Sequence, residues 1–174
     1  YSDGPIFCRY PRGEGEGVNI TNIIQDVKIG KGRIIRRGKD LAILALGTRV
    51  GSALKVADYL LRDNLKITVA DARFAKPIDT QLLEKLWNEH QKLIIIEEGS
   101  AGGFSSHCLH FLSSKDLLNK HDKEIKCLTM PDNFQDHASQ KEQLAKAGLD
   151  TDGLMKVVSK MISWLNTENK SITN

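Results

Sequence analysis

The sequence is poor in cysteine, proline and aromatic residues, and it carries almost no net charge. Its 174 residues include 3 cysteines, 4 prolines and 6% aromatic residues, and 25 basic against 22 acidic residues give a formal charge of +3. Three widely spaced cysteines without a CxxC pair argue against a disulfide framework and a structural zinc site, and they fit a reducing, cytoplasmic compartment. So small a charge argues against nucleic acid or an anionic membrane as a partner.

Long apolar runs and nucleotide-binding motifs are also missing. No stretch approaches the roughly 20 apolar residues of a membrane span, and residues 1–5, YSDGP, show neither the basic nor the apolar part of a signal peptide. The turn after the first long apolar strand reads LGTRVG, which is not the dinucleotide-binding GxGxxG, and no phosphate-binding GxxxxGK occurs. The only tight basic cluster is Arg36-Arg37, which we interpret as a solvated turn.

From residue 31 onward, apolar strands alternate with amphipathic helices. The predicted strands are 32–37, 41–46, 66–70, 92–96 and 125–130. The predicted helices are 50–61, 79–87, 103–112, 139–148 and 151–165, with Asp79, Ser139 and Thr151 as expected N-caps.

This alternation predicts an α/β fold with three layers, α/β/α, around a mostly parallel five-stranded sheet. We expect strand 32–37 to be antiparallel at one edge and to form a hairpin with strand 41–46 through Gly38-Lys39-Asp40. Residues 31–166 should form one domain, preceded by the end of another domain over 1–30 and followed by a tail over 167–174. The start of the chain suggests that it is the C-terminal piece of a longer protein.

Three polar loops stand at strand ends, where open α/β sheets place their functional groups, and the first follows a strand end that we expect within residues 1–30. They read RYPRG at residues 9–13, DARFAKPID at 71–79 and EEGSAGGFSSH at 97–107.

Individual polar residues in these loops have mostly structural interpretations. Asp71, Arg73 and Asp79 stand at a strand end, where a carboxylate and a guanidinium commonly tie a loop to a neighbouring helix terminus. Glu97 and Glu98 are adjacent on a strand and so point to opposite faces, which favours anchoring or dimer-interface roles over an acid/base pair. Outside these loops, His137 lies after the predicted strand 125–130 and lacks a visible partner.

No metal site is expected at the sequence His107-Cys108-x-His110, because no carboxylate or second cysteine stands near it. We assign no catalytic residue and no metal ligand.

In chain order, RYPRG, LAILALGT, TVADARFAKPID, IIIEEGSAGGFSSH and MPDNFQDHASQKEQLAKAGL resemble the 1-deoxy-D-xylulose-5-phosphate synthases of the transketolase superfamily. The resemblance covers residues 1 to about 165. It implies a homodimeric enzyme with thiamine diphosphate and Mg²⁺ that condenses pyruvate with glyceraldehyde 3-phosphate and releases CO2, for isoprenoid, thiamine and pyridoxal synthesis. Such an enzyme is cytoplasmic in bacteria or lies in a plastid-type compartment. Residues 1–30 would end its pyrimidine-binding domain, and residues 31–166 would be its C-terminal domain.

The resemblance also implies roles for two arginines. The phosphate-binding arginine of the YPRG motif corresponds to Arg12, and a planar guanidinium suits bidentate capture of a phosphate. Arg9 is a second candidate substrate ligand, although it could equally pair with an acidic residue of another domain. The family's metal-binding GDG motif and its activating glutamate belong to domains outside this sequence, so we expect this chain alone to bind no cofactor and to be inactive.

Two alternatives remain at this stage. A D-x-R-x-x-x-P-x-D loop is shared by transketolases and the β subunits of 2-oxoacid dehydrogenases, so the chain could be the C-terminal domain of such a subunit, although YPRG argues against it. The alternative of another class is a non-catalytic assembly module, in which the sheet edge and the Gly-rich loops serve only association.

Overall fold

Five strands form one sheet in the order β1-β3-β2-β4-β5. The computed structural model describes residues 4–8, 27–119 and 122–171. The strands are β1 (Arg33–Arg36), β2 (Leu41–Ala45), β3 (Ile67–Asp71), β4 (Lys92–Ser100) and β5 (Glu124–Met130). Strands β2 to β5 are mutually parallel, whereas β1 pairs with β3 in the antiparallel sense. The predicted mixed sheet with one antiparallel edge strand is therefore confirmed.

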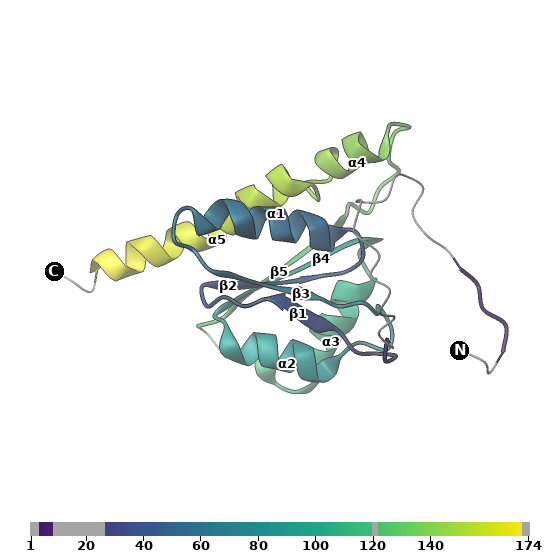
Figure 1. Ribbon diagram of the computed structural model, residues 1–174, viewed down its shortest axis with the longest axis horizontal. Helices are drawn as coiled ribbons and strands as arrows, with labels where there is room; N and C mark the ends of the chain where they lie inside the picture. The colour runs from purple at the N-terminus through teal and green to yellow at the C-terminus, as the bar shows by residue number, and fades with distance from the viewer. Residues whose placement is uncertain (1–3, 9–26, 120–121, 172–174) are drawn as a thin grey trace, which may run out of the picture.

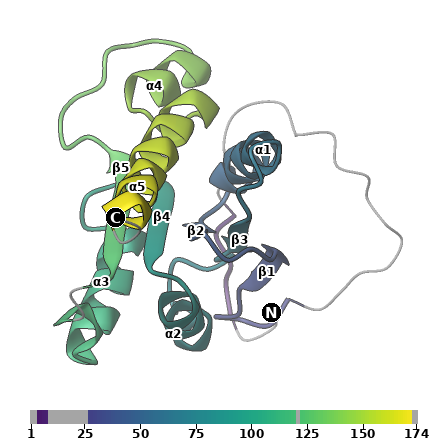
Figure 2. The same ribbon diagram turned by 90° about the vertical axis from the view of Figure 1, so that its left-hand side faces the viewer.

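The central position of β2 follows from its composition. All five of its residues are buried, so both faces and both edges of the strand must be covered. β1 alternates exposed and half-buried residues, a pattern that suits a strand at the edge. Figure 2 shows β1 and β5 at opposite edges of the sheet.

The predicted hairpin between the first two strands is wrong, because β3 lies between β1 and β2. The turn at Gly38-Lys39-Asp40 crosses the start of β3, where the backbone N–H groups of Lys39 and Asp40 donate to the Lys66 carbonyl oxygen at 2.9 and 3.1 Å. A Cβ at Gly38 would lie 2.1 Å from that oxygen, so this crossing requires glycine.

Helices cover both faces of the sheet and complete the three predicted layers (Figure 1). On one face, α1 (Arg49–Leu61) and α5 (Thr151–Ser171) bury Val56, Leu60 and Val158 against the strands. On the other, α2 (Thr80–Glu89) and α3 (Phe104–Ser114) bury side chains that include Trp87 and Leu112. A short 3-10 helix (Leu117–Asn119) follows α3, and α4 (Gln140–Lys146) precedes α5.

The helix ends match the sequence signals in two places and differ in a third. Asp79 caps α2 by accepting from the Leu82 N–H, and Ser139 forms a capping box with Glu142 at α4. The predicted cap of α5 is wrong by one residue, because Asp150, not Thr151, accepts from the Gly153 N–H at 2.8 Å. This helix continues to Ser171, since residues 166–171 contain no glycine or proline to end it.

No helix in the described part of the chain is long and apolar enough to cross a membrane.

Candidate functional site

The carboxyl ends of β2, β3, β4 and β5 meet at one edge of the sheet, because these strands are parallel. Ligands of open α/β sheets bind outside such an edge. The loops 71–79 and 97–107 lie there, and β1 begins there because it runs in the opposite direction. The loop 9–13, with Arg9 and Arg12, lies outside the described residues.

Asp71, the last residue of β3, holds two arginines at this edge. Its carboxylate accepts from the Nε of Arg33 at 3.2 Å and from the backbone N–H of Arg73 at 3.0 Å. The side-chain Nε of Arg73 lies 3.9 Å away. Arg73 has a φ of 58°, a left-handed conformation that costs free energy for a residue other than glycine. Two guanidinium groups therefore share one carboxylate, which leaves positive charge at the edge.

Asp79, at the far end of the same loop, has a structural role. Its Oδ1 caps α2, and its Oδ2 accepts from the Gly32 N–H at 3.1 Å, with the Lys31 ammonium 3.6 Å from Oδ1. Both aspartates thus tie the loop to the start of β1. The sequence context suggested a tie to a helix terminus, and only Asp79 makes one, at the start of α2. Between the two aspartates, the Lys76-Pro77 peptide bond is cis.

Glu97 and Glu98 point to opposite faces of β4, as expected. Glu97 is only 3% exposed, and its carboxylate accepts from the backbone N–H groups of Phe104 and Ser105 at 3.0 and 2.7 Å and from the Ser105 hydroxyl at 2.8 Å. It therefore anchors the start of α3, where a carboxylate complements the helix dipole. A Cβ at Gly103 would lie 2.7 Å from its Oε2, which explains the glycine there.

Glu98 joins three segments on the other face of β4. It accepts from the hydroxyl of Thr48 and lies 3.0 Å from the Nε of Arg49. Arg49 is buried, and its Nη1 donates to the Leu149 carbonyl oxygen at 2.7 Å. The ends of β2 and β4 are thereby fixed to the segment that leads into α5.

The sequence analysis missed Arg49. The signal was present, because Arg49 stands four residues before Ala53 and hence on the buried face of the helix. A cation at such a position requires an acidic partner, and the two glutamates at the end of the predicted strand 92–96 were the candidates.

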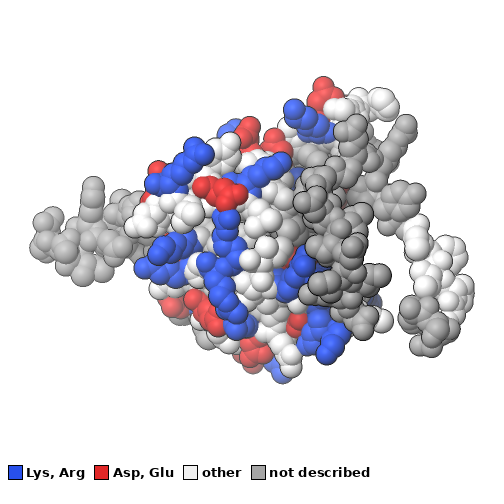
Figure 3. Space-filling view, viewed as in Figure 1, with Lys and Arg blue, Asp and Glu red and all other residues white. Residues whose placement is uncertain are grey.

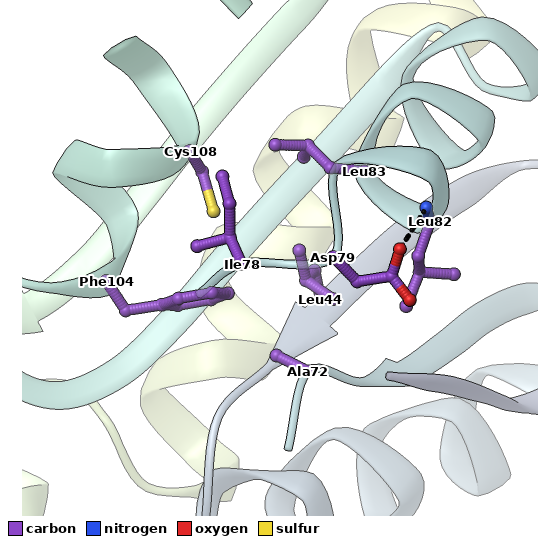
Figure 4. A pocket seen from close by; sticks show the side chains of 8 residues that line it. All are labelled: Leu44, Ala72, Ile78, Asp79, Leu82, Leu83, Phe104 and Cys108. Atoms are coloured by element: carbon purple, nitrogen blue, oxygen red, sulfur yellow. Dashed lines mark hydrogen bonds between the residues drawn. The ribbon is translucent and has the colours of Figure 1, made fainter. Parts of the chain in front are cut away.

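A small apolar cavity lies beneath this edge, between the loop 71–79 and α3 (Figure 4). Ile78, Phe104 and Cys108 line it together, and the Asp79 carboxylate beside it is already bonded to the Leu82 N–H. Its volume of about 10 Å³ leaves room for no more than a single water molecule. This cavity is therefore too small to hold a substrate.

Other titratable residues singled out from the sequence do not form a site. His137 is exposed in the loop after β5, where the neighbouring Asp136 pairs with Lys146 at 2.7 Å. His107 and His110 are exposed while Cys108 is buried, so these side chains do not converge. Among the described residues, no group of three or more His, Cys, Asp or Glu side chains could hold a metal ion.

These residues do not fit thiamine diphosphate and Mg²⁺. A Mg²⁺-diphosphate site needs several converging oxygen ligands, and the described edge offers only carboxylates that already bond arginines or backbone N–H groups. Any such cofactor would need other parts of the protein for its anchor.

Known proteins share this architecture. The family model described as "Transketolase, C-terminal domain" matches residues 30–154. A solved chain titled "Split gene transketolase, inactive beta4 tetramer" is similar in structure, with a TM-score of 0.66 and 27% sequence identity over 79% of this chain. The match covers 44% of that solved chain, so this chain spans less than half its length.

Proposed function

The chain belongs to the transketolase C-terminal domain family, and we propose that it is the C-terminal part of a 1-deoxy-D-xylulose-5-phosphate synthase. The full-length enzyme would condense pyruvate with glyceraldehyde 3-phosphate and release CO2. Thiamine diphosphate and Mg²⁺ would be held by other domains, as the poor fit of the described residues requires. The proposal includes a homodimer, a role in isoprenoid, thiamine and pyridoxal synthesis, and a bacterial cytoplasmic or plastid-type location.

One observation carries the proposal. The two loops with synthase-like sequences, ADARFAKPID and EEGSAGGF, lie at the same carboxyl edge, where Ile78 of the first and Phe104 of the second line one cavity. Either motif alone is compatible with other members of the superfamily, whereas the pair favours the synthase. Their proximity supports a common role at the substrate edge.

The charge around Asp71 supports an anionic substrate. Arg33 and Arg73 share the single carboxylate of Asp71, and this local excess of positive charge suits the phosphate of glyceraldehyde 3-phosphate. We propose that Arg12 is the main ligand of this phosphate. Arg9 is a second candidate ligand.

A transketolase reaction is the second candidate, because the structural neighbour is titled a split gene transketolase. That reaction would move a two-carbon unit between sugar phosphates and would not consume pyruvate. A 2-oxoacid dehydrogenase β subunit would consume pyruvate but pass an acyl group to a lipoyl partner.

A substrate panel tests the proposal. The full-length protein is supplied with thiamine diphosphate and Mg²⁺ and given pyruvate with glyceraldehyde 3-phosphate, pyruvate with lipoamide, or a ketose phosphate with ribose 5-phosphate. We expect 1-deoxy-D-xylulose 5-phosphate from the first pair and no turnover of the others. Turnover of the sugar phosphate pair alone, or of lipoamide, would replace the proposal with the corresponding alternative.

A further inference from the structure

A larger cavity lies at the opposite end of the sheet, away from the carboxyl edge. It has a volume of about 250 Å³ and lies between the end of β1, the start of β3 and the last turns of α1. Its lining residues are Arg36, Arg37, Ala57, Leu61, Leu65, Lys66 and Ile67. The Arg36-Arg37 pair, which the sequence suggested to be a solvated turn, is therefore part of a cavity wall.

The charged residues that line this cavity are all cations. Arg36, Arg37 and Lys66 contribute, and no carboxylate lies among the lining residues that the structure describes. Asp58 stands nearby on α1 and pairs with the Nη2 of Arg36. Figure 3 shows that Lys and Arg side chains gather over the face on which β1 lies, between α1 and α2. Asp40 also lies close, because its carboxylate accepts from the Lys66 backbone N–H at 2.6 Å. The described lining residues are therefore cationic, with two aspartates beside them.

Arg36 supplies an independent sign that an acceptor belongs here. Its Nη1 atom is buried and has no hydrogen-bond partner within the described part of the chain. Buried donors are nearly always satisfied, and an unpaired one calls for an acceptor such as a bound ion or water. Asp58 already bonds Nη2, and Arg36 is one of the residues that line the adjacent cavity, so an anion bound there is a candidate acceptor for Nη1.

The remaining wall is apolar. Ala57 and Ile67 are buried at its base, while Leu61 leaves 54% of its surface exposed at the end of α1. Apolar groups beside fixed cations form the usual pattern of a small-molecule site, in which the cations orient the ligand and the apolar wall gives affinity. The volume is below the 300–1,000 Å³ that is typical of drug-sized ligands, so the ligand must be small.

We propose that this cavity binds a small amphipathic anion, with one carboxylate or phosphate group joined to a short hydrocarbon portion. The anionic group lies against Arg36, Arg37 and Lys66, and the hydrocarbon portion lies on Leu61 and Leu65. The site does not depend on the proposed reaction, since it is built at the amino ends of the parallel strands.

Calorimetric titration of the full-length protein tests the site with four probes: hexyl phosphate, hexanoate, inorganic phosphate and hexanol. We expect saturable binding of hexyl phosphate or hexanoate, at least about tenfold tighter than that of inorganic phosphate or hexanol, because the two halves of the ligand use different walls. Comparing the two amphipathic anions identifies the preferred head group. Equal affinity for inorganic phosphate and hexyl phosphate, or no saturable binding of either amphipathic anion, would overturn the proposal.

Single substitutions test whether the amphipathic probe binds in this cavity. Arg37→Gln and Lys66→Gln each remove one exposed cation and should weaken the better amphipathic probe by about tenfold, the usual effect of a lost charge-assisted contact. Leu61→Glu places a carboxylate at the mouth of the cavity and should abolish binding without disturbing the fold, because Leu61 is exposed. Lys141→Gln removes an exposed cation of α4 and is the matched control. Equal weakening by the control would show non-specific attraction and contradict the assignment.

Discussion

Arg49 and Glu98 form an ion pair, Nε to Oε1 3.0 Å, that joins the start of α1 to the end of β4. The same guanidinium donates to the Leu149 carbonyl oxygen at 2.7 Å. Three segments that are distant in the sequence are thereby fixed at the carboxyl edge, close to the loops that we assign to substrate binding.

Replacing Arg49 with methionine should destabilise the fold. The buried Leu149 carbonyl oxygen would lose its donor and Glu98 its cation, so we expect the free energy of unfolding to fall by about 2–3 kcal/mol. Thermal unfolding should show a decrease in Tm of about 5–10 °C. Lys85→Met, which breaks the exposed Lys85–Glu89 pair, is the control and should cost less than about 0.5 kcal/mol. Equal losses would show that the buried pair has no special role.

Glu97→Gln tests the anchor of α3. Both carboxylate oxygens of Glu97 accept a backbone N–H, from Phe104 at Oε2 and from Ser105 at Oε1. The glutamine side chain has an NH₂ group in place of one of these oxygens. In either orientation, that NH₂ group would face an N–H donor. We expect a loss of about 2–3 kcal/mol in urea unfolding, because a buried N–H group loses its acceptor. Glu84→Gln alters an exposed carboxylate of α2 and should change stability by less than about 0.5 kcal/mol. A stability equal to that of the unaltered protein would mean that Glu97 does not hold the helix.

The cysteines should react with iodoacetamide in the order Cys8, Cys127, Cys108. Burial raises the pKa of the Cys108 thiol from 9.0 to about 12, and burial also raises the pKa of Cys127, whereas Cys8 is exposed. Only the thiolate reacts, so at pH 8 iodoacetamide should modify the buried Cys108 of the native protein far more slowly than the exposed Cys8. Mass spectrometry after timed quenching gives the order, and early labelling of Cys108 would contradict the packing of α3 on β5.

The same pKa shift predicts a loss of stability in alkali. The folded state keeps the Cys108 thiol protonated to a higher pH than the unfolded state does, so its contribution is complete below pH 9 and falls as the pH rises toward 12. Urea unfolding of the Cys108→Ala variant should therefore show a smaller decline over this range than the unaltered protein. Parallel declines would show that Cys108 is not the group responsible.

The succession of elements could be predicted from the sequence, because continuous apolar strands and one-sided helices each leave a distinct period. The order of the strands within the sheet could not. The turn at Gly38 looks like a hairpin turn, and only the contact of its backbone with Lys66 shows that β3 separates β1 from β2. Such a long-range pairing leaves no local signal.

The site was predictable only in part. Strand-end loops were identified from their polar residues and from a resemblance, and the opposite directions of Glu97 and Glu98 follow from the strand period. The three donors of Glu97 and the left-handed φ of Arg73 depend on how loops meet helices in space. The cavity beside Arg36 combines β1, α1 and β3, so no single stretch of sequence reveals it.

Arg12→Ala in the full-length enzyme should weaken the use of glyceraldehyde 3-phosphate and largely spare pyruvate. Loss of a charge-assisted contact to a phosphate should lower kcat/KM for the aldehyde by about 30- to 150-fold. Lys141→Ala, on the exposed side of α4, is the control and should leave both substrates unaffected. A lower Tm with an unchanged KM for the aldehyde would instead give Arg12 a purely structural role.

The rate of CO2 release from pyruvate by the full-length enzyme, measured as the concentration of glyceraldehyde 3-phosphate is raised, tests the central claim most directly. A 1-deoxy-D-xylulose-5-phosphate synthase should release CO2 at a rate that rises with the aldehyde and saturates, with one ketose phosphate formed for each CO2. Release that is independent of the aldehyde, or no release at all in the presence of thiamine diphosphate and Mg²⁺, would contradict it.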